Sequence, residues 1–211
     1  MTINEYYFIT KWRVKGSLEE VADILKDVES LVKWWPSVYL GVKVLRQGNE
    51  NGVGTLVELD TKGWLPYTLK WNFCVTESDY PNRIALKASG DFEGKGVWTF
   101  EKDNEHVKIT YDWKIQARKP LIRYFTWLLK PVFSLNHRWA MAKGLESLKL
   151  ELERRRLSSD KSKIPLPPQP TTTSSKPLII SFLTIAGVIG GIFLICKEQP
   201  FQFLTKNGGK E

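Results

Sequence analysis

An uncharged apolar run near the C-terminus constrains this chain more than any other feature of its sequence. Residues 178–196, LIISFLTIAGVIGGIFLIC, carry no charged side chain over 19 positions. As an α-helix the run would be about 28 Å long, which matches the hydrocarbon core of a bilayer. The alternative, a fully buried globular helix, would need a domain to surround it. The run therefore predicts one membrane-spanning helix.

The charges that flank this run predict its orientation. Lysine and arginine are denser before it, at Arg154, Arg155, Arg156, Lys161, Lys163 and Lys176, than after it, at Lys197, Lys206 and Lys210. By the positive-inside rule, the N-terminal part of the chain is expected in the cytosol, held by a single-pass C-terminal anchor. Gly187 and Gly191 form a GxxxG pair, the pattern of helices that associate with a second copy.

Composition divides the chain into four segments. Residues 1–157 have ordinary globular proportions and are long enough to bury a core. Residues 158–177, SSDKSKIPLPPQPTTTSSKP, are rich in Pro, Ser and Thr, which predicts an extended linker that does not pack and reaches about 60 Å. The apolar run 178–196 follows, and a short polar tail covers 197–211.

The net charge of +8 is compatible with nucleic acid, anionic lipid or a solvated surface. Much of the excess lies close to apolar sequence and upstream of the run, which favours a membrane surface. No nucleic-acid-binding motif accompanies the charge, so no nucleic-acid partner is predicted. The two cysteines, Cys74 and Cys196, give no disulfide framework, which fits a reducing compartment.

Seven stretches of alternating polar and apolar residues predict an antiparallel sheet. The first covers residues 6–14, and the other six cover 40–46, 54–61, 66–76, 83–89, 94–101 and 106–117. Turn-forming sequences separate several of them, namely GNENG at 48–52, ESDYPN at 77–82 and KDNE at 102–105. The pattern is that of an antiparallel meander.

Helices are predicted on both sides of this meander. Ser17 and Glu20 form a capping box for a helix after the first strand, and Pro36 ends a second short helix at 31–35. After Pro120 a long helix is expected, with a kink at Pro131. Its predicted apolar stripe is Phe125, Leu128, Val132, Leu135, Trp139, Ala142, Leu145, Leu148 and Leu152.

This order of elements resembles the helix-grip fold of the START-like superfamily (SRPBCC), which includes Bet v 1-like and polyketide cyclase/dehydrase-type proteins. The resemblance covers about residues 3–156 and also rests on WWPSV at 34–38, the Gly-bounded turn at 48–54 and the long terminal helix. It implies an α+β domain in which a seven-stranded antiparallel sheet wraps around the C-terminal helix. It also implies a cavity there for a lipid, isoprenoid, sterol or polyketide-like molecule.

Strand parity predicts which side chains face this helix. The inward set is Tyr6, Phe8, Trp12, Val42, Val44, Val57, Leu59, Tyr67, Leu69, Trp71, Phe73, Ile84, Leu86, Trp98, Phe100, Ile109, Tyr111 and Trp113. Taken singly, each of these residues fits an ordinary core as well as a ligand site. The predicted ligand-lining residues are Trp35, Tyr67, Trp71, Trp98, Tyr111, Trp113, Phe125, Leu128, Phe133 and Trp139.

The sequence offers little for catalysis. Its two histidines and two cysteines do not form a metal-ligand pattern, and no cofactor motif is present. If the chain is an enzyme of the cyclase or dehydratase type, the acid/base candidates are His137, Tyr111 and Tyr67. Glu58 is a further candidate, but its strand parity turns it toward solvent.

Three functions therefore stay open. The leading one is membrane-tethered binding or transfer of a hydrophobic small molecule, in which the domain shields the ligand from water. The second is a polyketide cyclase or dehydratase that uses the same cavity. The third is a non-catalytic module that binds another protein through the surface of the fold.

Overall fold

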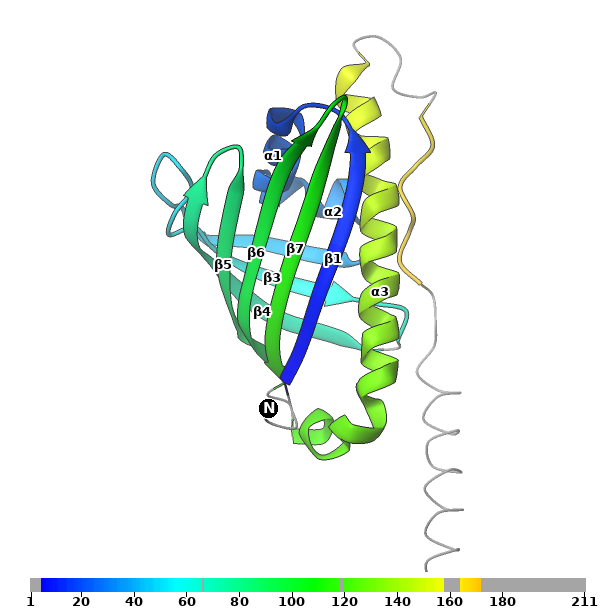
Figure 1. Cartoon of the computed structure of the whole chain (residues 1–211). Helices are drawn as coiled ribbons and strands as arrows, with labels where there is room; N and C mark the ends of the chain where they lie inside the picture. The colour runs from blue at the N-terminus through cyan, green and yellow to red at the C-terminus, as the bar shows by residue number, and fades with distance from the viewer. Residues whose placement is uncertain (1–4, 66, 118–119, 158–163, 172–211) are drawn as a thin grey trace, which may run out of the picture. The chain divides into compact units, whose positions relative to one another are not determined.

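Seven antiparallel strands form one sheet in the computed structural model, as the sequence predicts (Figure 1). The strands are β1 (Glu5–Lys15), β2 (Tyr39–Arg46), β3 (Leu56–Lys62), β4 (Thr68–Asp79), β5 (Arg83–Gly90), β6 (Phe92–Asp103) and β7 (His106–Ala117). Their order is β1-β7-β6-β5-β4-β3-β2, so the meander β2 to β7 is completed by β1 pairing with β7. The sheet edges are thus the first two strands of the chain.

The structure describes residues 5–65, 67–117, 120–157 and 164–171, with the backbone alone at 117 and 120–129. These residues belong to a compact unit that covers Met1–Thr173, while Ser174–Glu211 form a second unit. The predicted anchor at 178–196 and the tail at 197–211 lie outside the described residues. Within the described ranges, no helix combines the length and the apolar character needed to cross a bilayer.

Four helical segments accompany the sheet. They are α1 (Leu18–Lys26), the 3-10 turn η1 (Val28–Ser30), α2 (Leu31–Trp34) and α3 (Pro120–Arg156). The predicted capping box at the start of α1 is confirmed, because Ser17 Oγ accepts from the Glu20 amide at 3.2 Å and Glu20 Oε2 accepts from the Ser17 amide at 2.8 Å. The long helix α3 contains Pro131 and runs beside β1 in Figure 1, where its first turns bend away from its long straight part.

The inward set predicted from strand parity is buried or half-buried throughout. Tyr39 joins it because a β-bulge between Tyr39 and Gly41 reverses the parity at the start of β2. Leu40, its neighbour, is consequently 42% exposed. Glu58, the weakest of the acid/base candidates, faces solvent as its parity predicts.

The predicted apolar stripe of α3 is wrong in part. Leu148 and Leu152 are buried, but Leu135 and Ala142 are exposed, and Met141 and Gly144 face the interior. The buried line therefore steps from Met141 through Gly144 to Leu148 at intervals of three and four residues. The sequence allowed two such lines because apolar residues lie on more than one side of this helix.

Part of the predicted linker packs against the domain. Ile164 and Pro167 are buried, and Lys62 Nζ donates to the carbonyl oxygen of Thr171 at 2.6 Å. The hydroxyl of Thr171 donates to the Gly63 carbonyl at 3.3 Å. We call residues 164–171 the strap. The expectation that this composition does not pack is wrong for the strap, because prolines lose little entropy on ordering and the side chains of Ile164 and Pro167 are buried.

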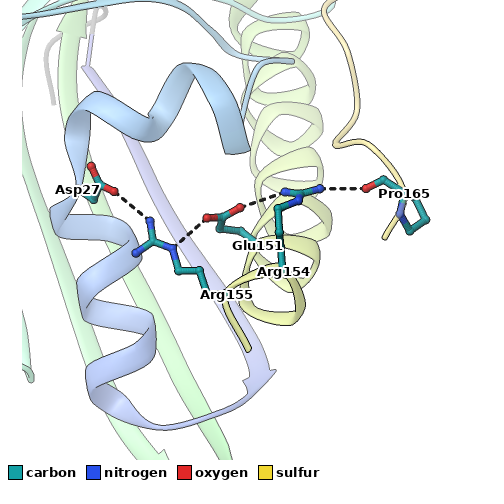
Figure 2. A network of polar contacts seen from close by, with 5 residues as sticks. All are labelled: Asp27, Glu151, Arg154, Arg155 and Pro165. Atoms are coloured by element: carbon teal, nitrogen blue, oxygen red, sulfur yellow. Dashed lines mark hydrogen bonds and ion pairs between the residues drawn. The ribbon is translucent and has the colours of Figure 1, made fainter. Parts of the chain in front are cut away.

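A polar network ties the strap to α3 and α1 (Figure 2). Arg154 donates to the Pro165 carbonyl at 3.1 Å and pairs with Glu151 at 3.0 Å. Arg155 pairs with Glu151 and with Asp27, each at 2.9 Å. Arg156 pairs with Glu20 at 2.7 Å and holds the pKa of that carboxyl at about 2. Arg154, Arg155 and Arg156, which belong to the basic stretch ahead of the apolar run, thus all make polar contacts within the domain.

Candidate functional site

A cavity of about 340 Å³ opens between α1, η1 and the concave face of the sheet. Its mouth lies at the end of α1 and at the loop of residues 47–52, where Lys26, Asp27 and Glu50 are exposed. Its interior is aromatic and aliphatic, with Trp35, Tyr39, Val44, Trp71, Phe73, Val75, Ile84, Leu86, Trp98, Tyr111 and Met141. We call it the first cavity.

A second cavity of about 180 Å³ adjoins the first. It is lined by β1, the end of β3 and α3, through Tyr6, Phe8, Thr61, Lys62, Tyr67, Leu69, Phe92, Trp113, Phe133, Asn136 and His137 among others. Trp35, Tyr39, Trp71, Tyr111 and Met141 line both cavities. The polar side chains of the second cavity include Thr61, Asn136 and His137.

Most of the predicted ligand-lining residues meet at these cavities. Trp98 lines the first, Tyr67, Trp113 and Phe133 line the second, and Trp35, Trp71 and Tyr111 line both. Trp139 lines neither cavity, because it lies about 200° around α3 from His137. It is half-buried and packs against the core. The side chains of Phe125 and Leu128 lie outside those that the structure describes.

Stacked rings shape the wall that the sheet gives to the first cavity. Trp98 and Tyr111 stack with centroids 3.9 Å apart and planes 12° apart, and Tyr111 stacks on Trp113 at 5.5 Å. Gly96 makes room for these rings, because a Cβ there would lie 2.8 Å from both Tyr111 Oη and Trp113 Cε3. The sequence therefore needs glycine at this inward position of β6.

Tyr39 and Tyr111, which line both cavities, are uncharged. Burial raises the pKa of Tyr39 and of Tyr111 above their ordinary range. Burial also raises the pKa of Tyr67 in the second cavity. These hydroxyls therefore keep their protons at neutral pH and can donate hydrogen bonds to a ligand, whereas they are unsuited to act as bases.

His137 is held neutral in the second cavity. Burial lowers its pKa to about 4, and its ring stacks on Phe8 with centroids 4.1 Å apart. Its Nε2 atom is covered and has no hydrogen-bond partner among the described residues. The structure thus brings His137, Tyr67 and Tyr111 to one cavity, but a base whose pKa is about 4 accepts a proton weakly at neutral pH.

The histidine makes the stability of the domain depend on pH. Because its pKa is about 4 when folded and about 6.5 when unfolded, the unfolded chain binds the proton first as the pH falls. The free energy of unfolding should therefore drop by at most about 3 kcal/mol between about pH 6.5 and about pH 4 on this account. Urea titrations of the wild type and of His137→Phe across this range measure the difference, and equal slopes would contradict the assignment.

Tyr39, Met141 and Phe92 are among the lining residues that the sequence patterns do not predict. The inward orientation of Tyr39 depends on the bulge, and Gly41 is the one sequence signal for that bulge. Met141 lay between two alternative stripes of the helix. Phe92 lies in β6 ahead of the predicted strand, which began at Gly94. Among the described residues, no group of three or more His, Cys, Asp or Glu side chains could hold a metal ion.

Comparison with solved structures supports the fold. No family model matches the chain, and no curated protein matches it. An aromatase/cyclase from Streptomyces sp. R1128 superposes with a TM-score of 0.57 at 16% identity, covering 74% of this chain and 98% of that one. A protein from Thermus thermophilus gives 0.56 at 21% identity, covering 71% and 96%.

A START superfamily protein from Mycobacterium smegmatis gives a TM-score of 0.54 at 16% identity, covering 71% of this chain and 98% of that one. At these identities the likeness concerns the fold. The predicted helix-grip architecture is thereby confirmed in its sheet and its long C-terminal helix. The described domain has the fold of START superfamily and aromatase/cyclase structures.

Proposed function

We propose that this chain binds a hydrophobic small molecule in the two cavities on the concave face of the sheet. The observation that carries the proposal is the first cavity, whose 340 Å³ lies within the usual range for small-molecule sites and whose interior is aromatic and aliphatic. A lipid, an isoprenoid or a polyketide-like molecule fits this chemistry. Burying about 200 Å² of its apolar surface would contribute about 5 kcal/mol.

We further propose that the apolar run at 178–196 anchors the protein to a membrane, with the domain on the cytosolic side. The absence of charge over 19 residues and the denser Lys and Arg before the run support this. A bilayer is also a natural source of an apolar ligand. Self-association through Gly187 and Gly191 belongs to the same proposal.

Binding can be tested with the neutral fluorescent probe N-phenyl-1-naphthylamine and the purified full chain. Leu86 lines the first cavity and is 9% exposed, so Leu86→Trp should fill part of the space and weaken probe binding at least tenfold. Leu135 is 50% exposed on α3, so Leu135→Trp is the matched control and should bind as the wild type does. Val44→Phe repeats the test at a half-buried position.

The outcomes are distinct. Equal affinity in all variants would place the probe outside the first cavity and would overturn the proposal. Mass spectrometry of a solvent extract of the purified chain then identifies any molecule that copurifies. A full chain that binds no probe and carries no extractable ligand would leave the protein-interaction module as the surviving function.

A second candidate function is an enzyme that acts on a polyketide-like or lipid substrate. The observation in its favour is that His137, Tyr67 and Tyr111 line one cavity, while the fold is shared with an aromatase/cyclase structure. Once a copurifying molecule is known, its turnover can be followed in Tyr67→Phe and His137→Asn. Loss of turnover with ligand binding intact would support the enzyme, and unchanged turnover would exclude these residues.

A further inference from the structure

The two cavities adjoin at residues that line both of them. Five residues line both of them and form what we call the partition: Trp35, Tyr39, Trp71, Tyr111 and Met141. The first cavity lies on one side of the partition, toward the mouth at Lys26 and Glu50. The second lies on the other side, toward Tyr67 and His137. The side-chain conformations of the partition therefore bear on how far the two spaces connect.

Four members of the partition are rings held by their neighbours. Trp71 Nε1 donates to the Thr61 hydroxyl at 3.0 Å, and Tyr111 stacks on Trp98. The Trp35 ring lies against Gly144 of α3 and packs against Tyr39 edge to face, with centroids 5.2 Å apart. Each of these rings would have to break a defined contact in order to move.

Met141 is the fifth member and differs in kind. It is buried on α3, 6% exposed, and its side chain is unbranched with three rotatable bonds. A thioether forms at most weak hydrogen bonds, so packing alone holds it in place. Methionine fills irregular gaps in cores and changes rotamer at low cost.

We propose that Met141 is the specificity-determining residue of the binding site and sets the length of ligand that it accepts. The inference rests on the proposed binding function. The ligand class is an elongated, uncharged molecule that occupies the first cavity and whose end abuts Met141. With Met141 across the passage, the site ends at the partition; with Met141 turned aside, it extends toward Tyr67 and Phe133.

The test uses 1-alkanols of about 6 to about 16 carbons as displacers of N-phenyl-1-naphthylamine from the full chain. In the wild type, affinity should rise about fourfold per methylene until the first cavity is filled and then level off. Met141→Ala should move this plateau to longer chains and raise the affinity of the longest alkanols at least tenfold. Met141→Leu, of similar volume, should keep the wild-type plateau.

Met141→Phe should have the opposite effect to Met141→Ala. A ring in the passage should make the affinity level off at shorter alkanols. It keeps the test decisive if Met141→Ala proves unfolded by far-UV circular dichroism. A plateau at the same length in the wild type, Met141→Ala and Met141→Phe would overturn the role of Met141 while leaving the binding site intact. Failure of every alkanol to displace the probe from any variant would overturn the alkyl-accepting site itself, and the proposed function with it if the probe also fails to bind.

Discussion

Replacing Trp71 with alanine should lower the free energy of unfolding by about 3–5 kcal/mol. The indole is 8% exposed and packs against Phe73, Phe92 and Trp113, with centroid distances between 4.8 and 6.1 Å. Its removal loses the transfer free energy of a large ring and leaves a cavity that rigid neighbours cannot refill. Urea unfolding of the full chain, followed by far-UV circular dichroism, measures the loss.

A double-mutant cycle separates packing from hydrogen bonding at this position. Trp71→Phe keeps a ring but gives up the bond from Nε1 to the Thr61 hydroxyl, which should cost about 1 kcal/mol beyond the loss of volume. Thr61→Val removes the acceptor while leaving the indole. The coupling between the two substitutions should therefore be about 1 kcal/mol. A Trp71→Ala variant within about 1 kcal/mol of the wild type would contradict this packing.

Replacing Gly144 with valine should cost about 3 kcal/mol of stability and weaken probe binding. A Cβ at position 144 would lie 2.2 Å from Trp35 Cζ2 and 2.6 Å from Cε2, distances that real Cβ contacts do not reach. Either the indole of Trp35 moves or α3 does. Since Trp35 lines both cavities, its displacement should also reduce the space available to a ligand.

The matched control for this variant is Ala142→Val, two residues away on the same helix. Ala142 is exposed, so this control adds a β-branched side chain to α3 without touching Trp35. It should change stability by less than about 0.5 kcal/mol. Equal losses in the two variants would mean that helix propensity, and not the contact with Trp35, decides the result.

Strand parity predicts more of the structure than any other sequence pattern in this chain. Alternation along each strand is fixed by the pleat, so one choice of face for Trp12, Leu59 or Tyr111 assigns all its neighbours. The capping box at Ser17 and Glu20 was equally readable because it depends on residues three positions apart. The same local rules gave the sheet and most of the predicted lining residues.

The remaining features depend on contacts between distant parts of the chain. The bulge that turns Tyr39 inward is set by how β2 pairs with β3, and Gly41 alone is not enough to predict it. The face that α3 buries is decided by Trp35, which needs Gly144 beneath it. The inward positions of Met141 and His137 follow from the face that α3 buries. Docking of the strap depends on Lys62, more than a hundred residues before Thr171.

The strap also changes the mechanics of the proposed membrane anchor. The sequence gives the linker twenty residues, 158–177, and a reach of about 60 Å. With residues up to Thr171 bound to Lys62 and Gly63, six residues, 172–177, remain before the apolar run. Their full extension is about 20 Å. The linker would then hold the domain within a short distance of the proposed anchor. Release of the strap would lengthen it, with the loss of a few hydrogen bonds and the exposure of two buried side chains.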